Sequence, residues 1–437
     1  MAHYEERTWQ GSPTGQTRRD RSTCSYRAYV PDPLVGRALM LPADLVADLE
    51  DAASAVNALQ DSQTGLASVE SVARMLMRAE AVGSSYIEGL QVSARRLAKE
   101  EFAERAGLET SDDTARAVLG NIHAMSSALD LADLDRAITV EDLCALHADL
   151  LAGTRDERWG GVIREEQNWV GGANPCRAAY VPPPHEHVRE LLGDLCVYLS
   201  GDDHSAIMQA ALVHAQFETI HPFVDGNGRV GRALIHLVLR RRGLAPSFVP
   251  PVSLILATNA GAYISGLVSF RYDAPAEDPS ANEAVLQWVD RFVNELLRSC
   301  EDAAGFANRL EELEGQWRIA AGNPRRGSAA DRLLSALPGL PILTVETAAA
   351  AVGRHRSNVN DAVNALWAAG VLHKGTVGKR NRVFEVTDLL DAITQLERQL
   401  ASPAADTASA RPTRAVPKRT VPKRTAPTRT APTRPRR

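Results

Sequence analysis

The twelve residues from His221 to Arg232, HPFVDGNGRVGR, constrain the fold of this chain more than any other stretch. Pro222 and two glycines exclude a continuing helix, so the first half of the stretch is a loop. From Arg229 onward, apolar residues recur at the i, i+3, i+4, i+7 spacing of a helix with one buried face: Val230, Ala233, Leu234, Leu237 and Val238. The sequence therefore predicts a loop that opens a buried helix.

The residue types in this loop indicate phosphate chemistry. The backbone N–H groups at the helix N-terminus and the helix dipole form an anion site, here at Gly226, Asn227 and Gly228. Arg229 and Arg232 are three residues apart and can reach the same anion. Asp225 is a hard oxygen ligand suited to Mg²⁺, and His221 is suited to accept a proton near neutral pH. Together they predict phosphoryl or nucleotidyl transfer to a hydroxyl.

Two other phosphate-binding interpretations of these glycines fail. The loop matches GxGxxG literally, but the dinucleotide fingerprint needs a preceding apolar strand and an acidic residue ~20 positions further on. The preceding stretch AALVHAQFETI has a helical pattern, and residues 247–251 contain no acid. A P-loop would need a GK[ST] sequence to close it, which is absent from this stretch.

HPFVDGNGRVGR resembles the signature of Fic-domain proteins, HxFx[D/E]GNGRxxR, with every specified position filled. The resemblance runs from about Tyr29 to about Leu297 and includes HAQFETI, YVPPP and SLILATNAGAYISGL. It implies a mainly α-helical Fic-type bundle with a small β-hairpin flap. It also implies a nucleotidyltransferase that moves AMP from ATP to a Tyr, Thr or Ser hydroxyl of a protein, which includes the chain itself.

The resemblance assigns a role to each residue of the signature. His221 would deprotonate the hydroxyl, and Asp225 would hold Mg²⁺ against the α- and β-phosphates. Arg229 would bind the β-phosphate and Arg232 the γ-phosphate. The anion hole would consist of the backbone of Gly226, Asn227 and Gly228 with the Asn227 side chain.

Further residues are implied by resemblance outside the signature. Asn259 and Tyr263 match a downstream family motif and would lie near the nucleotide. A flap within the Arg158–Pro184 stretch, where aromatic and β-branched residues flank Gly-Gly and Asn-Pro, would pair with the main chain of the target. Its docking residues would be Asn168, Trp169, Val170 and Tyr180.

The segment SSYIEGL resembles a second family motif, [S/T]xxxE[G/N], at Ser84, Glu88 and Gly89. Ser84 and Glu88 are one helical turn apart and face the same way. The resemblance implies that Glu88 pairs with Arg232 and blocks the γ-phosphate site, in the N-terminally autoinhibited class. A carboxylate can replace a phosphate as a forked partner of arginine. The alternative is an ordinary helix end with serine hydroxyls and a glycine cap.

Composition divides the chain into five segments. Residues 1–35 are polar and predict a poorly ordered start. Residues 36–110 form an N-terminal helical region with the inhibitory helix, and residues 111–315 form the catalytic domain. Residues 326–395 follow the element order of a winged helix-turn-helix. Residues 401–437, with a proline every five positions, predict a disordered Pro/Arg-rich tail.

The net charge of −5 hides an asymmetry between body and tail. The tail has ten Lys or Arg and one acid, a charge of +9, which leaves −14 on the first 400 residues. A basic tail can solubilise the chain or contact nucleic acid or an acidic partner. A DNA-binding regulator that uses the winged helix and tail is therefore an alternative function, and protein contact by the winged helix is equally open.

Several classes are excluded or left open by the remaining patterns. No apolar window reaches ~18 residues, so no membrane span is expected, and the N-terminus lacks a secretory apolar region. The five cysteines are far apart and include no CxxC pair, so they support neither a disulfide framework nor a zinc ribbon. We interpret them as core residues of a protein in a reducing cytoplasm. De-AMPylation, another phosphate-containing transfer and a homodimer stay open.

Overall fold

The computed structural model describes residues 1–11, 22–61, 69–108, 111–377 and 381–400. Most of these residues are helical, as predicted, and the rest include two small antiparallel sheets. The α-helices are α1 (Ala43–Asp61), α2 (Val69–Ile87), α3 (Ala94–Arg105), α4 (Asp113–Ala132), α5 (Val140–Leu151), α6 (His185–Ser200), α7 (Ala206–Ile220), α8 (Asn227–Arg241), α9 (Val252–Thr258), α10 (Ala260–Ser269), α11 (Pro279–Ala320), α12 (Ala329–Ala336), α13 (Val345–Val352), α14 (Arg356–Ala368) and α15 (Thr387–Leu400). The strands are β1 (His3–Trp9), β2 (Cys24–Val30), β3 (Ile342–Leu343), β4 (His373–Val377) and β5 (Asn381–Glu385).

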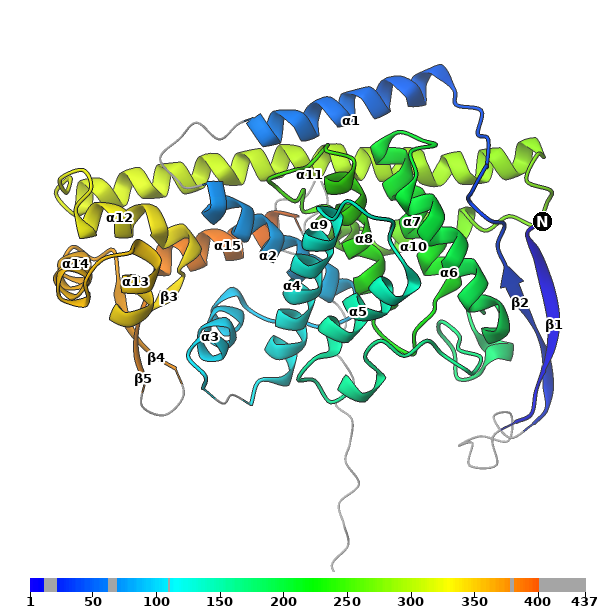
Figure 1. Ribbon diagram of the computed structural model, residues 1–437, viewed down its shortest axis with the longest axis horizontal. Helices are drawn as coiled ribbons and strands as arrows, with labels where there is room; N and C mark the ends of the chain where they lie inside the picture. Colours follow the sequence, from blue (N-terminus) through cyan, green and yellow to red (C-terminus); the bar gives the residue numbers. More distant parts are fainter. Residues whose placement is uncertain (12–21, 62–68, 109–110, 378–380, 401–437) are drawn as a thin grey trace, which may run out of the picture.

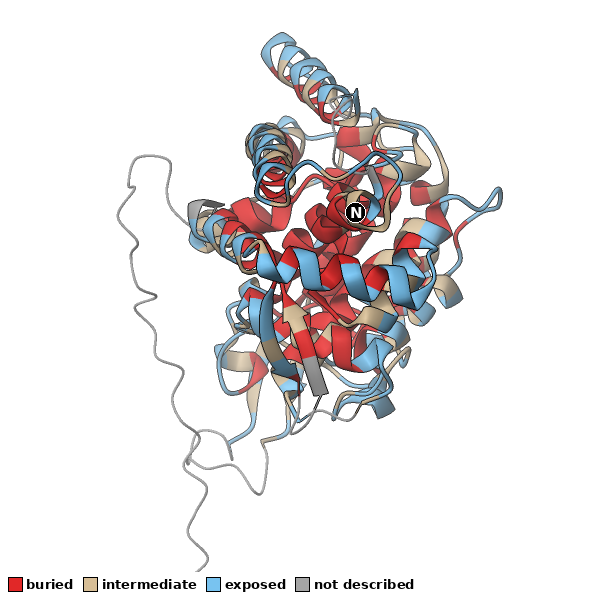
Figure 2. Cartoon of the chain, turned by 90° about the vertical axis from the view of Figure 1, so that its left-hand side faces the viewer, coloured by how far each residue is buried: buried red, intermediate tan, exposed pale blue. Residues whose placement is uncertain are grey.

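The centre of the bundle is the pair α7 and α8. Every residue from Ile207 to Ile220 in α7 is buried, and so is every residue from Asn227 to Leu239 in α8. A helix buried on all sides must be covered by others, and α2, α4, α5 and α11 do this. Figure 2 shows the buried residues on these inner helices and the exposed residues on the outer faces. The loop between α7 and α8 is therefore held by a rigid core.

The longest helix, α11, runs along the bundle with α1 lying beside it (Figure 1). The Trp288 side chain of α11 is fully buried, and its indole N–H donates to the Ala211 carbonyl of α7 at 2.8 Å. This contact fixes the long helix against the central pair.

The N-terminal segment differs from the prediction of a poorly ordered start. Strands β1 and β2 pair antiparallel, with His3 opposite Val30 and Trp9 opposite Cys24. β1 alternates exposed and less exposed residues, and β2 does so until its last three residues, which are all buried. Both strands carry aromatic or β-branched side chains, which suits a half-covered pleated surface. The polar composition concealed this two-residue period. Residues 12–21 lie outside the described residues.

A disulfide joins Cys24 of β2 to Cys176 in the short 3-10 helix η2 (Pro175–Arg177). The reading of all five cysteines as unpaired core filler is wrong for these two, which are 152 positions apart in sequence. Only Cys196 and Cys300 are buried free thiols, and Cys144 is half-buried. No local spacing signal could reveal a pair that only the tertiary fold brings together.

The segment after α11 has the predicted order of helices and strands, with a three-stranded sheet in the order β3-β5-β4. Its interpretation as a winged helix-turn-helix stays a prediction. The sequence analysis missed α15, which packs against α2, α3, α9 and α11. The Trp317 indole N–H of α11 also donates to the Asp388 carboxylate of α15 at 3.2 Å. This segment is therefore docked on the helical body, while the tail from residue 401 lies outside the described residues.

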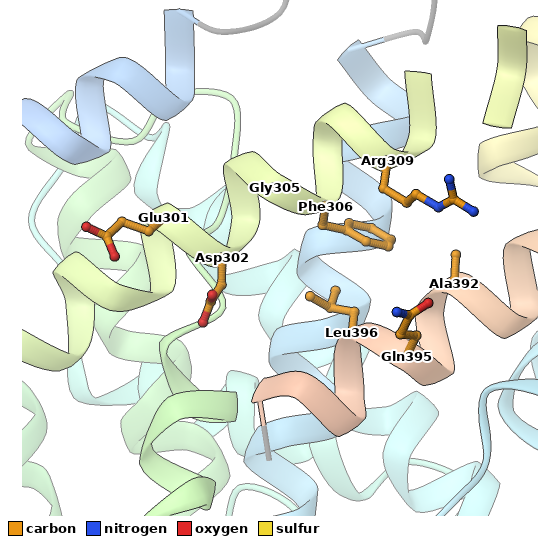
Figure 3. A pocket seen from close by; sticks show the side chains of 8 residues that line it. All are labelled: Glu301, Asp302, Gly305, Phe306, Arg309, Ala392, Gln395 and Leu396. Atoms are coloured by element: carbon orange, nitrogen blue, oxygen red, sulfur yellow. The ribbon is translucent and has the colours of Figure 1, made fainter. Parts of the chain in front are cut away.

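A cavity of about 280 Å³ lies between α11 and α15 (Figure 3). Phe306 and Leu396 line it together with Glu301, Asp302 and Arg309. Its mixed apolar and charged lining marks a gap at the seam between the two helices. Among the described residues no single helix is long and apolar enough to cross a membrane, although α9 and α10 pass that test as a pair bent by 100°.

Candidate active site

His221 stands at the C-terminal end of α7 in the left-handed region, with φ 50° and ψ 60°. This conformation is strained for a residue other than glycine and persists only when its surroundings impose it. Arg164 imposes it from a buried position, since its Nε donates to the His221 carbonyl at 2.9 Å and its backbone N–H donates to the Pro222 carbonyl at 2.9 Å. Asn168 adds a donor to the His221 carbonyl at 3.2 Å and one to the Phe223 carbonyl at 3.0 Å.

Arg164 lies outside the family motifs and was not among the predicted site residues. In the sequence it is one of three arginines in the Arg158–Pro184 stretch, and nothing local distinguishes it from Arg158 or Arg177. Burial lowers the pKa of its guanidinium to about 10, which still leaves it charged at neutral pH. Its donors go to four main-chain carbonyls, those of His221, Glu166, Pro183 and Ile220. Arg164 therefore ties the flap region to the loop that carries His221.

The imidazole of His221 is poised as a neutral base. Burial lowers its pKa to about 4, and the nearby charges of Arg164 and Arg271 act in the same direction. Its Nδ1 has no hydrogen-bond partner among the described residues, and the nearest carboxylate oxygen, Glu218 Oε2, is 4.0 Å away. A neutral imidazole can accept a proton at physiological pH.

Glu218 is a second residue that the sequence analysis missed. Its side chain is 9% exposed, and burial raises the pKa of its carboxyl to about 7. It lies one helical turn before His221 and faces the same ring. Its position suits a group that orients the imidazole and stabilises the imidazolium after proton transfer.

The loop itself is built by contacts behind the anion site. Gly226, with φ 80°, begins α8 in a conformation that glycine adopts without strain. The Asn227 amide donates to the Phe223 carbonyl and accepts from the Phe223 N–H, both at 2.8 Å. In this structure the side chain therefore braces the loop, and its predicted part in the anion hole stays a prediction. Its backbone N–H still lies at the helix start.

A third missed residue, His147, supports the loop from α5. Its ring stacks on Phe223 with centroids 3.8 Å apart. Its Nδ1 accepts from the Gly161 N–H at 3.0 Å, so Nε2 carries the proton and donates to the Asp225 carbonyl at 2.9 Å. This positions Asp225 without using its carboxylate.

Asp225 and Arg229 form the outer rim of the site. The Arg229 Nη2 donates to the Asp225 Oδ2 at 3.0 Å. Arg229 is buried, whereas 65% of the Asp225 side chain is exposed. Within the described ranges no cluster of three or more metal-binding side chains exists. The site therefore fits Mg²⁺ only when phosphate and water supply most ligands, which is how Mg²⁺ is usually bound.

Arg232 is 1% exposed and faces the inhibitory segment. Its Nε donates to Ser84 Oγ at 2.9 Å, and its Nη2 donates to the Ser84 carbonyl at 2.8 Å and to Glu88 Oε1 at 2.8 Å. Burial by itself would raise the pKa of Glu88, but the charge of Arg232 and its hydrogen bond outweigh burial and lower it. The predicted contact is present, and Glu88 is held ionised.

The Glu88 carboxylate also covers the start of α8. A Cβ atom added at Gly228 would overlap Glu88 Oε1. Gly89 follows with φ 81°, which turns the chain away directly after the carboxylate. The carboxylate thus occupies the positive end of the helix dipole, the place predicted for a phosphate.

Tyr263 and Asn259 both make hydrogen bonds within the protein. Tyr263 is buried, and its hydroxyl lies 3.4 Å from Arg232 Nη1 and 3.0 Å from His214 Nε2. It supports Arg232 from behind. Asn259 caps α10 by accepting from the Ala262 N–H at 3.2 Å. Their predicted role beside the nucleotide stays a prediction.

The flap has fewer paired residues than the predicted β-hairpin. Val170 and Tyr180 form an isolated antiparallel bridge, in which the Val170 N–H donates to the Tyr180 carbonyl at 2.8 Å. The Tyr180 hydroxyl donates to the Thr219 carbonyl at 2.7 Å, which anchors the flap to α7. Two glycines and a proline interrupt the segment between the paired residues, so a longer ladder does not form. Trp169 packs edge-on against Trp9 of β1, with centroids 5.4 Å apart.

Two matches cover the elements that build this site. Residues 137–239 match the Fic/DOC family, and residues 46–130 match the Fic/DOC family N-terminal region. The chain carries a Fic/DOC-family domain. The first match includes the Fic signature from His221 to Arg232, and the second includes Glu88.

Curated relatives of this Fic domain are protein adenylyltransferases. Protein adenylyltransferase fic-1 of Caenorhabditis briggsae is 34% identical over 131 residues, which cover 29% of this chain and 23% of that protein. Protein adenylyltransferase Fic of Drosophila ananassae is 37% identical over 117 residues, 26% of this chain and 22% of that protein. The matches thus span less than a quarter of either relative.

A solved Fic family protein from Desulfovibrio desulfuricans aligns with 82% of this chain and 98% of its own, at 20% identity and a TM-score of 0.47.

Proposed function

We propose that this Fic protein is a protein adenylyltransferase that moves AMP from ATP to a Tyr, Thr or Ser hydroxyl of a protein. One observation supports it above the others: a half-buried His221 with a lowered pKa precedes a helix N-terminus that is flanked by the buried Arg229 and Arg232. A base beside an arginine-flanked anion site is the arrangement that nucleotidyl transfer to a hydroxyl requires.

The chemistry follows from these positions. Unprotonated His221 takes the proton from the acceptor hydroxyl, whose oxygen forms a bond to the α-phosphorus of ATP. The bond from that phosphorus to the bridging oxygen breaks, and pyrophosphate leaves. The N–H groups at the start of α8 and Arg229 stabilise the phosphate charge. Mg²⁺ held by Asp225 would supply further positive charge to the phosphates.

Glu88 is the proposed inhibitor of this reaction. Its carboxylate already occupies the anion site and pairs with Arg232 at 2.8 Å. A triphosphate can reach the productive position only after this carboxylate moves, because two anions would otherwise share one cation. The wild-type protein is therefore expected to turn over slowly.

Mass spectrometry with Mg²⁺ and ATP tests the reaction class. We compare the wild type with Glu88→Gly, with His221→Ala, and with the double variant. An AMP adduct in the Glu88→Gly protein that disappears with His221→Ala supports the proposal. A phosphoryl adduct, or an AMP adduct that survives loss of His221, would overturn it. Binding of ATP measured in parallel separates loss of the base from loss of nucleotide.

A second candidate is removal of AMP by the same site. The Glu88 carboxylate is 36% exposed, so one oxygen can bind Arg232 while the other positions a water. This reaction needs an intact Glu88, whereas AMP transfer is expected to improve without it. Incubating an AMP-modified Fic protein with the wild type and with Glu88→Gly distinguishes the two: release of AMP only by the wild type supports this candidate.

Three accessory proposals concern partners and location. The first is that the segment from α12 to α15 and the basic tail bind nucleic acid or protein. The second is that two copies of the chain form a homodimer. The last is that the protein acts in the cytoplasm. The Cys24–Cys176 disulfide weighs against the last proposal, because such bonds persist mainly in oxidising compartments. The salt dependence of DNA affinity tests the first, and sedimentation tests the second.

A further inference from the structure

A groove of about 970 Å³ is walled in part by the β1–β2 hairpin and reaches the loop that carries His221. Its walls come from the hairpin, from residues 159–169 before and at the flap, and from the start of α6. Val224, which is 53% exposed, lines the groove and belongs to the Fic signature. A ligand in the groove would therefore contact the loop that carries the proposed base.

The groove is rich in aromatic side chains, with Trp9, Tyr26, Trp159 and Trp169 among its lining. The Trp9 and Trp169 rings meet edge-on, which makes a rigid ridge. Aromatic-lined grooves bind proline-rich segments because the polyproline II conformation is already extended and loses little entropy on binding. The lining thus favours a proline-containing chain segment.

The charge of the groove favours a basic ligand. Glu165 and Glu166 are exposed and form no ion pair within the described residues. The cations nearby are already engaged: Arg7 pairs with Glu5 at 2.6 Å and Glu186 at 2.8 Å, and the Arg164 guanidinium is buried on carbonyls. The exposed Trp159 ring of the groove already has the Arg158 guanidinium over it, 5.2 Å from the ring centroid, so this indole accepts a cation. Two free carboxylates near such a ring suit lysine or arginine, which contact both.

The geometry points to one occupant, and we propose that the groove binds the chain's own basic tail, residues 401–437, as a tethered AMP acceptor. This inference rests on the proposed function. The tail repeats VPKRT twice and then APTRT and APTRP, so proline, basic residues and threonine alternate. Lys418-Arg419-Thr420 and Lys423-Arg424-Thr425 each place a hydroxyl directly after a basic pair.

The tail is long enough to reach the groove. It begins after Leu400, the last residue of α15, and has 37 residues. An extended chain of that length spans up to about 120 Å, whereas a folded body of about 400 residues has a radius of gyration of about 21 Å. The tail can therefore serve the same molecule or a second copy.

The reaction at the tail is the one already described for a hydroxyl. The threonine Oγ–H gives its proton to His221, and Oγ bonds to the α-phosphorus of ATP. The bond to the bridging oxygen breaks and pyrophosphate leaves, so threonyl-O-AMP and pyrophosphate are the products. No further reactant is needed.

The test maps AMP adducts on the full-length Glu88→Gly protein with Mg²⁺ and ATP. We expect adducts on tail threonines, reduced at least tenfold by Glu165→Gln with Glu166→Gln. Glu141→Gln with Glu312→Gln, two exposed glutamates elsewhere, should leave them unchanged. A charge-exchange variant combines Glu165→Arg and Glu166→Arg in the groove with Lys418→Glu and Arg419→Glu in the tail. Because the opposite charges then face each other again, labelling at Thr420 should return.

The outcomes separate this inference from the proposed function. Adducts elsewhere on the chain, with the tail unlabelled, would overturn the tail assignment and leave AMP transfer standing. Tail adducts that persist at full level without Glu165 and Glu166 would overturn the groove. Preferential labelling of an unrelated basic protein added in equal amount would replace the tail as occupant. No adduct on any acceptor would instead refute AMP transfer.

Discussion

Glu88 Oε1 lies 2.8 Å from Arg232 Nη2, although the two residues are 144 positions apart in sequence. The contact joins the end of α2 to the second turn of α8 and places a carboxylate over the helix start, where the phosphate is proposed to bind. Together with the Ser84 hydrogen bonds to the same arginine, this pair connects the N-terminal helical region to the helix that follows the proposed catalytic loop. Under the proposed autoinhibition, the strength of this pair sets how often the site is open.

Ser84 shares the restraint on Arg232, so we expect Ser84→Ala to raise AMP labelling a few-fold and Glu88→Gly to raise it at least tenfold. The serine supplies one of two side-chain acceptors for this guanidinium in the α2 region. Because both residues act on one arginine, the double variant should gain less than the product of the two effects. Labelling rates of the four proteins measure this. Independent, fully multiplicative effects would contradict a shared restraint.

The pH dependence should reveal the lowered pKa of the proposed base. With the pKa of His221 lowered to about 4, the imidazole is unprotonated above that value and loses its function only as the pH falls through it. Labelling by the Glu88→Gly protein should therefore stay nearly constant from pH 8 to pH 6 at saturating Mg²⁺. Half of the activity lost near pH 6.5, the ordinary histidine value, would show that the base is not buried during catalysis. Glu218→Gln should alter the profile without altering ATP affinity.

Arg164 should matter for turnover more than for nucleotide binding. Its guanidinium holds the left-handed His221 backbone and touches no predicted phosphate position. We expect Arg164→Lys in the Glu88→Gly background to lower the labelling rate about 100-fold, as a misplaced base does, with little change in ATP affinity. Arg155→Lys, at an exposed site in the same region, is the matched control. Equal loss in both variants would contradict the positioning role.

Asp225 should set the Mg²⁺ requirement. Its carboxylate is 65% exposed at the rim of the site and pairs only with Arg229 in the described structure. Asp225→Asn should raise the Mg²⁺ concentration for half-maximal labelling at least tenfold, because a neutral amide is a weaker ligand. Asp156→Asn serves as an exposed control outside the site. An unchanged Mg²⁺ titration would remove Asp225 as a metal ligand.

The disulfide between Cys24 and Cys176 should stabilise the hairpin against the flap. Replacing both cysteines with serine should lower the free energy of unfolding by about 2–5 kcal/mol, the usual effect of losing such a cross-link. Cys144→Ser, at a free half-buried thiol, should have a smaller effect. The bond itself is checked on protein isolated under thiol-blocking conditions, by peptide mapping without reductant. Full alkylation of both cysteines there would mean that the pair is reduced in the cell.

Much of the local structure could be predicted because its causes are local. The apolar spacing after Arg229 predicted α8, and glycine at 226 and 228 predicted a loop and an open helix start. The same periodicity located the helices on either side of the flap. In contrast, the β1–β2 hairpin was missed because its polar composition outweighed a short two-residue period.

The sequence by itself determined which residues could do chemistry: a histidine, a carboxylate, an anion loop and two arginines within twelve positions. Only the tertiary structure decided their states. It strained His221 through Arg164, turned the Asn227 amide to Phe223, placed Tyr263 behind Arg232 and joined Cys24 to Cys176. The physical reason is range: helix periodicity and glycine conformations act over a few residues, whereas burial, ion pairing and disulfides depend on segments that meet only after the chain has folded.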